Sequence, residues 1–225
     1  MPFNDLARNA ALDGLDEGVA AGILYVGVNQ LTTAPPGDGT PGTGATAAST
    51  EASGGSPAYA RQAVAWATAS GGQKSNSGAL TIDVPAGTYG FLSLWNASTG
   101  NSGTQYRGYV PINGSTKGFF SVDTTLTNDA LLSVAHGLAD GDRVILFNVF
   151  AESLPTGLTE GAVYYVVSSA TNSFKVSNSS GGAAVDITAV GGGEGYFQKV
   201  IPEVFASQGQ ITVATGQLVL DATGI

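Results

Sequence analysis

The sequence predicts an all-β protein: an antiparallel β-sandwich, jelly-roll-like, with a short N-terminal helix and a small inserted β-subdomain. Short runs rich in β-branched and aromatic residues recur along the 225 residues, and turns bearing Gly, Pro or Asn separate them. The flanks of the chain share one sequence style that residues 124–199 interrupt. We therefore expect a main sandwich of residues 1–123 with 200–225, and an inserted β-module of residues 124–199.

The first expected element is a short amphipathic helix with apolar residues near helical spacing. The simpler interpretation packs it on the chain's own domain, and the alternative extends it to a neighbouring subunit. Gly18 is the expected stop, and residues 23–28 then form a compact apolar run that predicts a buried strand. The apolar residues of the helix are Phe3, Leu6, Ala10 and Leu15.

Residues 32–57 form a long low-complexity loop of Thr, Ala, Gly, Pro and Ser. It has too few apolar side chains to offset the entropy lost on ordering. Such a loop inside a compact domain is either disordered or docked on a partner, and docking is the favoured interpretation.

The strands of the main domain follow in turn. In residues 89–95 aromatic and aliphatic residues fill both faces, so this strand is expected to be covered on two sides. An Asn113–Gly114 turn predicts that residues 106–112 and 117–122 pair as a hairpin. Trp66 and Trp95 are expected in the core. The remaining expected strands are residues 59–67, 80–84, 203–213 and 217–221.

The inserted module is predicted to contain an antiparallel meander of residues 143–148, 163–168 and 173–177. Tyr164 and Tyr165 are adjacent, so they point to opposite faces of their strand and one of them is expected to be exposed. His136 precedes the meander and is interpreted as a turn or surface residue that caps backbone groups. Its replacement by Ala should therefore leave function intact.

Composition excludes several classes of function. With 8 Lys and Arg against 17 Asp and Glu, the formal net charge is −9, and scattered cations disfavour a nucleic-acid partner. One His and no Cys exclude a zinc site of the usual kinds. No signal sequence and no apolar run of about 20 residues is present, so neither secretion nor membrane insertion is expected. We expect no cofactor.

Candidate chemistry is weak along the rest of the chain. A Ser–His–Asp triad would need His136 as its base, and no G-x-S-x-G motif accompanies it. Calcium could use Asp140 with Asp142, or Asn128 with Asp129, but neither pair completes a calcium loop and solvated turns are the simpler interpretation. A glycosidase pair could be drawn from a set of five carboxylates, although nothing in their spacing brings two together. These are Asp123, Glu152, Asp186, Glu194 and Glu203.

Three segments resemble a family of small tailed-bacteriophage virion proteins, variously labelled tail fibre, minor tail or decoration proteins. They are ASGGSPAYARQAVAWATASGG (52–72), LTIDVPAGTYGFLSLWNASTG (80–100) and PEVFASQGQITVATGQLVLDA (202–222). Residues 136–186 resemble a separate module that is common in phage structural proteins, with the pattern AHGL, then GD, then LP-x-GL, then YYVV. The matching positions are turn formers and core aromatics, so no catalytic residue is carried over.

The resemblance implies a non-enzymatic structural protein located in the virion, with other phage virion proteins as partners. Capsid decoration is the expected role, in which the chain stabilises the shell by subunit contacts, as a homo-oligomer that could be a trimer. The alternative is a minor tail or tail-fibre protein, or an adhesin for host cell-surface glycan. For an adhesin, the expected binding surface is Tyr164, Tyr165 and Phe147.

Overall fold

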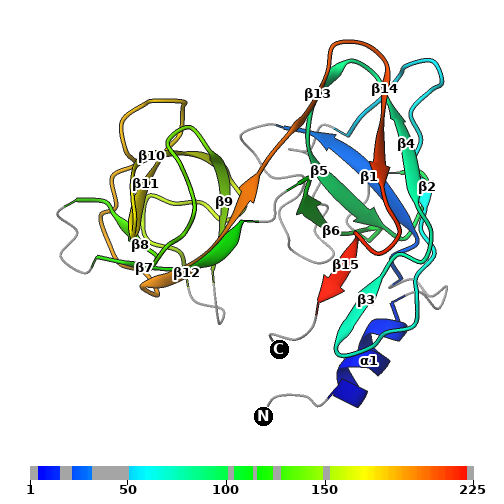
Figure 1. Cartoon of the computed structure of the whole chain (residues 1–225), viewed down its shortest axis with the longest axis horizontal. Helices are drawn as coiled ribbons and strands as arrows, with labels where there is room; N and C mark the ends of the chain where they lie inside the picture. The colour runs from blue at the N-terminus through cyan, green and yellow to red at the C-terminus, as the bar shows by residue number, and fades with distance from the viewer. Residues whose placement is uncertain are drawn as a thin grey trace. The chain divides into compact units, whose positions relative to one another are not determined.

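The computed structural model describes residues 5–15, 22–31, 51–100, 104–113, 116–123, 128–148 and 153–221. The chain is mostly β, with one short helix and antiparallel sheets that include a six-stranded barrel (Figure 1). It divides into two compact units. The first unit holds the described residues up to 30, those from 51 to 110 and those from 203 to 221; the second holds Leu31 and the described residues from 111 to 202.

The first unit is built on a five-stranded sheet in the order β13–β5–β1–β2, with β6 also paired to β5. Two smaller sheets, β14–β4 and β15–β3, accompany it. The elements of this unit are α1 (Asp5–Asp13), β1 (Tyr25–Gln30), β2 (Gln62–Ala63), β3 (Gln73–Ser75), β4 (Leu80–Val84), β5 (Gly87–Trp95), β6 (Tyr106–Pro111), β13 (Glu203–Phe205), β14 (Gly209–Val213) and β15 (Val219–Asp221).

Strand β5 is the centre of this unit. Every residue from 89 to 95 is buried, which confirms the prediction that the strand is covered on both faces. Leu92 and Leu94 pair with Val28 and Val26 of β1. On the alternate positions, Ser93 and Trp95 lie across from Gly27 and Tyr25. One face of the sheet is therefore aliphatic, and the other is aromatic and polar.

Helix α1 packs on the first unit, as the simpler interpretation predicted. Its Leu12 lies against Ala69, Leu15 and Leu220, and Asp13 accepts hydrogen bonds from the Lys74 ammonium (2.6 Å) and the Ala69 N–H (2.8 Å). The expected apolar face is wrong at Leu6, which is 78% exposed, and at Ala10, which is also exposed. Phe3 and Gly18 lie outside the described residues.

The second unit is a closed antiparallel barrel in the order β10–β11–β8–β7–β12–β9, completed by the pairing of β9 with β10. The predicted meander of residues 143–177 is confirmed, because β9, β10 and β11 are consecutive neighbours. The strands are β7 (Lys117–Val122), β8 (Leu131–Leu132), β9 (Arg143–Phe147), β10 (Val163–Ala170), β11 (Ser173–Ser177) and β12 (Glu194–Val200).

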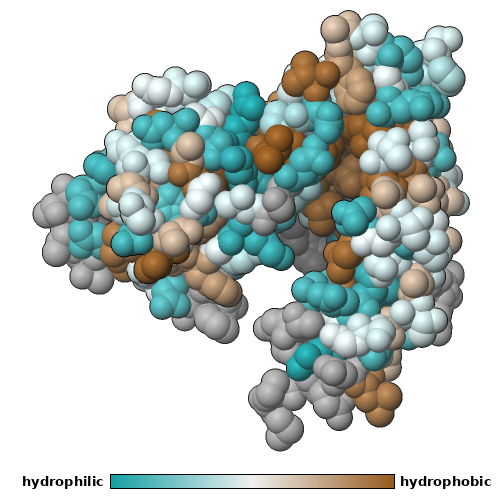
Figure 2. Space-filling view, in the orientation of Figure 1, coloured by the Kyte–Doolittle hydropathy of each residue, from teal (hydrophilic) through white to brown (hydrophobic). Residues whose placement is uncertain are grey.

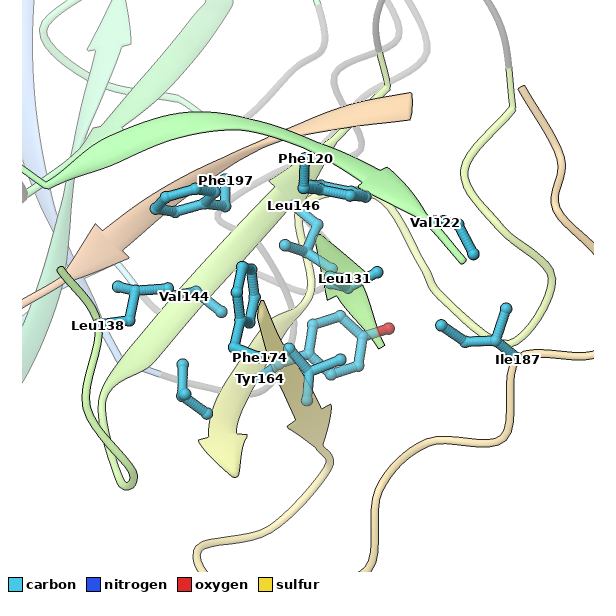
Figure 3. Close-up of a cluster of buried hydrophobic side chains, with 12 residues drawn as sticks. Phe120, Val122, Leu131, Leu138, Val144, Leu146, Tyr164, Phe174, Ile187 and Phe197 are labelled. Atoms are coloured by element: carbon cyan, nitrogen blue, oxygen red, sulfur yellow. The ribbon is translucent and has the colours of Figure 1, made fainter. Parts of the chain in front are cut away.

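The inside of the barrel is filled by one apolar cluster, with Phe174 against Phe197 at a ring distance of 5.4 Å (Figure 3). Two close fits tie β7 to β12. Gly195 lies directly across from Phe120, and Gly118 directly across from Phe197. A methyl group on either glycine would meet the facing ring, so each glycine makes the space that a phenyl ring of the neighbouring strand occupies.

The predicted hairpin of residues 106–112 and 117–122 is wrong. Strand β6 pairs with β5, whereas β7 pairs with β12 and β8. Asn113 does adopt a left-handed conformation with φ of 54°, so the local turn signal is real, but the turn leads the chain from one unit into the other.

The sandwich is not confirmed, because the sheets are separate and one unit is a barrel. The units divide at residues 110/111 and 202/203, compared with the expected 123/124 and 199/200, because β7 and β12 belong to the barrel.

Of the low-complexity loop, residues 32–50 lie outside the described residues, whereas Glu51 and Ala52 bond to β1.

Candidate interaction surface

The outer wall of the barrel over β7 and β12 carries the largest exposed aromatic group of the second unit's described part. Side chains alternate along both strands: Phe120 and Phe197 fill the core, so Phe119 and Tyr196 point outward. Phe119 is 67% exposed. A single exposed ring is ordinary, so it indicates a contact surface only where other apolar side chains join it.

Three rings form a continuous row across three strands. Phe119 and Tyr196 are cross-strand partners with ring centroids 5.4 Å apart in an edge-on arrangement. Tyr196 is also the partner of Phe147 on β9, at 6.4 Å. Cross-strand aromatic pairs of this kind stabilise a sheet, and here they also hold the outward rings in fixed positions.

Strand β8 extends this apolar surface with aliphatic side chains. Leu132 is the partner of Ser121, and Val134 follows two residues later, in the turn after β8. Val134 is 83% exposed and Leu132 is 40% exposed. Figure 2 shows brown hydrophobic atoms among polar ones on the part of the barrel where β7 and β8 lie. We call Phe119, Tyr196 and Phe147 the outer row.

Two opposite charges flank the outer row. Lys117 precedes Phe119 by two residues, and Glu194 precedes Tyr196 by two. Because the strands are antiparallel, Lys117 lies beside Gln198 at one end of the pair and Glu194 beside Ser121 at the other. Both charged side chains belong to exposed residues. These three pairs are therefore apolar in the centre and carry one positive and one negative charge, and Asp123 follows β7 at the Glu194 end.

The three binding residues expected from the sequence are placed differently. Phe147 belongs to the outer row. Tyr165 also points outward and is half-buried, with the Arg143 guanidinium 5.4 Å from its ring centre. Tyr164 is the inward member of the pair, only 3% exposed, and its hydroxyl accepts a hydrogen bond from the Thr159 N–H (2.7 Å). Tyr164 is therefore a core residue and cannot contribute to a binding surface.

Sequence reasoning missed Phe119 and Tyr196. The signal was present, because each belongs to an adjacent aromatic pair, Phe119–Phe120 and Tyr196–Phe197, to which the argument used for Tyr164 and Tyr165 applies equally. What the sequence lacked was the pairing of β7 with β12, strands separated by about 75 residues in the chain.

His136 is a buried structural residue. Its Nδ1 accepts a hydrogen bond from the Leu138 N–H (3.0 Å), its Nε2 lies 2.7 Å from the Ala170 carbonyl oxygen, and its ring packs on Phe174. These contacts fix the tautomer with the proton on Nε2. The expectation that it caps backbone groups is confirmed, but the surface location is wrong, because it is buried.

The oxygen clusters weighed for calcium are occupied by hydrogen bonds of the fold. Asp142 Oδ2 accepts from the Ala139 N–H and the Lys199 ammonium, and Asp140 accepts from the Ser169 N–H. Asp129 accepts from the Ile187 N–H. Among the described residues, no group of three or more His, Asp and Glu side chains gathers in a metal-binding arrangement. Likewise, no described helix has the length and apolarity needed to span a membrane.

The carboxylates considered for glycoside cleavage are dispersed over several elements. Glu194 is on β12 and Glu203 on β13, while Asp123 follows β7 and Asp186 is exposed in the segment after β11. Glu152 lies outside the described residues.

A buried ionic network occupies the first unit, at the segment that carries the GGSPAYAR pattern. Arg61 binds both carboxylate oxygens of Glu51 at 2.7 Å and stacks 3.5 Å from the centre of the Trp95 ring. Its remaining donors bind the carbonyls of Ala97 and Gly100. These four hydrogen bonds are made within the chain, so the network holds residues 51–61 on the sheet.

Tyr59 completes that network. Its hydroxyl donates to Glu51 Oε1 at 2.7 Å and accepts from the Val28 N–H at 2.9 Å. Burial, and then the charge of Glu51, raise the pKa of this hydroxyl far above its usual range, so it remains a donor. Gly27 makes the arrangement possible, because a methyl group there would lie 2.7–2.9 Å from Glu51, Ser93 and Tyr59 oxygens.

Comparison with known proteins finds no protein-family model, no curated protein and no solved structure that matches this chain.

Proposed function

We propose that this chain is a non-enzymatic structural protein of a bacteriophage virion, and that it acts as a capsid decoration protein through contacts made by its barrel. The observation that carries this proposal is the outer row: the exposed Phe119 ring and two half-buried rings, held in line on a closed barrel beside the exposed Leu132. A mixed aromatic and aliphatic surface with charges of both signs at its ends suits contact with another protein.

The roles of the polar residues support the same proposal. The groups that could do chemistry, His136, Asp142 and the Arg61–Glu51 pair, are all held by hydrogen bonds that build the fold. The segments that resemble phage virion proteins likewise supply turns, a buried ion pair and core aromatics. A chain constructed in this way works by its surfaces, as a shell-stabilising protein does.

We also propose that the first unit is a β-sandwich in which the β14–β4 sheet covers the aliphatic face of the five-stranded sheet. Buried Ile82, Val84 and Ile211 point inward from β4 and β14, and β4 lies close to β1 and β2. A sheet packed there accounts for the burial of Leu92 and Leu94 on that face of β5. On the other face, Tyr109 and Tyr106 pack against Phe91 and Trp95.

Immunogold electron microscopy tests the location. Antibodies raised against the purified chain are applied to phage particles from the source bacterium, and copy number is measured by quantitative mass spectrometry. A decoration protein labels the capsid and approaches the major capsid protein in copy number. Label at the tail tip with few copies would support the alternative below, and particles free of the chain would refute a virion role.

The alternative is a tail or tail-fibre adhesin that binds host cell-surface glycan. The ring series of Phe119, Tyr196 and Phe147 favours it, because fixed aromatic faces also bind sugars. Leu132 and Val134 weigh against it, since they offer no hydrogen bond to a sugar hydroxyl. Cosedimentation with purified cell walls separates the two: a Tyr196→Ala variant should lose binding only if the adhesin role is correct.

A further inference from the structure

The outer surface of β7 and β12 is arranged as a grid of three cross-strand pairs. Glu194 lies beside Ser121 at one end, and the Phe119–Tyr196 pair lies in the middle. Lys117 lies beside Gln198 at the other end. The two charges therefore occupy opposite corners, on different strands, with the aromatic pair between them.

We propose that two copies of this chain associate through this surface about a two-fold axis. An axis in the plane of the contact, perpendicular to the line from Lys117 to Glu194, exchanges those two positions. Each Lys117 then faces Glu194 of the partner subunit, and the Phe119–Tyr196 pairs of the two copies face each other. An apolar centre between opposite charges at exchanged corners is what a self-complementary, isologous contact requires.

Charge favours a second copy over other occupants of this surface. At a net charge of −9, two copies repel each other over most of their surfaces. The grid holds one Lys and one Glu, so two copies that meet there bring opposite charges together instead of adding to this repulsion. A basic partner would be attracted by the acidic chain in general and would gain nothing from Lys117. The contact is two-fold, and so it differs from the trimer considered from the sequence.

Sedimentation velocity on the full chain at low salt tests this contact. The wild type should form a dimer whose fraction rises with concentration between about 5 and about 200 µM. Phe119→Ser removes the central ring and should raise the dimer dissociation constant by more than about tenfold. Val204→Ser is the matched control, because Val204 is similarly exposed, at 70%, but lies on β13 in the first unit. This control should leave the dissociation constant unchanged.

Charge reversal gives a second test that does not depend on removing an apolar side chain. K117E and E194K each create two like-charged contacts per dimer, and each should raise the dissociation constant about tenfold. The double variant K117E/E194K restores both opposite-charge contacts and should return to within about threefold of the wild type. Circular dichroism and thermal melts establish that each variant keeps its fold.

Three outcomes would overturn the proposal: a wild-type chain that stays monomeric over the whole range, a double variant no better than the single ones, or a control that dissociates as much as Phe119→Ser. The proposal does not rest on a virion role, since it concerns the purified chain alone. A dimer in solution can therefore be confirmed even if phage particles lack the protein. Likewise, the protein can be found in particles even if the purified chain is monomeric.

Discussion

At the scale of single residues, His136 illustrates how a polar side chain can serve the fold. It satisfies the Leu138 N–H and the Ala170 carbonyl while covering Phe174. Its ring therefore joins the turn before the meander to the end of β10. The structure assigns this residue to the stability of the barrel.

Replacement of His136 should accordingly destabilise the second unit. His136→Ala leaves a buried donor without a partner, so we expect a loss of about 1–3 kcal/mol in the free energy of unfolding. His136→Asn should lose less, because an amide oxygen can take the place of Nδ1 beside the Leu138 N–H. Chemical denaturation of the three proteins measures the order. Equal stability of His136→Ala and wild type would contradict the role given to this residue.

Gly27 offers a similar test in the first unit. Gly27→Ala places a methyl group against three oxygens of the buried network, so it should cost about 1–3 kcal/mol. Gly78→Ala is the matched control, because its added methyl group meets nothing within 4 Å and its φ is ordinary. Thermal melts should show a lower melting temperature for Gly27→Ala alone. Similar melting temperatures for the two variants would mean that the side chains of the network can move aside, and would contradict this prediction.

At the scale of elements, the joint between β7 and β12 depends on glycine. Gly195→Ala would drive a methyl group into the Phe120 ring, whereas Gly118→Ala would bring one to 3.1 Å from the Phe197 ring. We expect both to destabilise the barrel, by up to about 3 kcal/mol, with Gly195→Ala the more severe. Urea denaturation of the two variants gives the comparison. The reverse order would mean that Phe120 turns away more easily than its packing suggests.

Helix α1 should respond to acid. The Lys74 hydrogen bond, followed by that of the Ala69 N–H, holds the pKa of Asp13 below its ordinary value of 3.8. A lowered folded-state pKa gives docking energy that is complete above the unfolded value and is lost as pH falls through the folded one. Amide NMR signals of α1 should therefore stay constant from neutral pH to about 5 and shift below about 4. Asp13→Asn should remove this transition, whereas Asp83→Asn on β4 should preserve it.

Individual strands and the local pairing of β9, β10 and β11 were predictable from the sequence, whereas the pairing of strands far apart in the chain was not. Residues 80–84, 117–122 and 173–177 are strands with the expected bounds, because local alternation and turn residues determine them. Pairing across the chain follows from fits such as Phe120 over Gly195, which no local pattern reveals. For that reason the sequence places β7 in the sandwich, and it does not indicate that Phe119 and Tyr196 form a surface together.

The buried network in the first unit was hidden for the same reason. Glu51 stands at the end of a low-complexity segment that gives no sign of order. Its role depends on Arg61 and Tyr59, which donate hydrogen bonds to its carboxylate and hold it on the sheet. The strand expected at residues 59–67 is reduced to Gln62–Ala63. Side chains hold Tyr59 and Arg61, and residues 64–67 make only isolated backbone bonds.

At the scale of the whole molecule, the barrel should fold without the rest of the chain. A fragment of residues 112–202 contains all six strands and the complete apolar cluster, so we expect a cooperative melt. A fragment of residues 124–199 lacks β7, and with it Phe120 and Val122, and should not melt cooperatively. Circular dichroism on both fragments checks this. A cooperative melt of the shorter fragment would restore the boundary first expected from the sequence.

The way the chain enters and leaves the barrel has a mechanical consequence. The chain enters at Lys117 and leaves at Val200, and Lys117 is the partner of Gln198, so entry and exit are at the same end of the β7–β12 ladder. Tension between the flanking segments would break the hydrogen bonds of this ladder one after another, like a zipper, instead of all together. The barrel should thus yield at low force. Fully drawn out, residues 117–200 would reach roughly 280 Å at about 3.4 Å per residue, enough for this unit to act as an extensible tether.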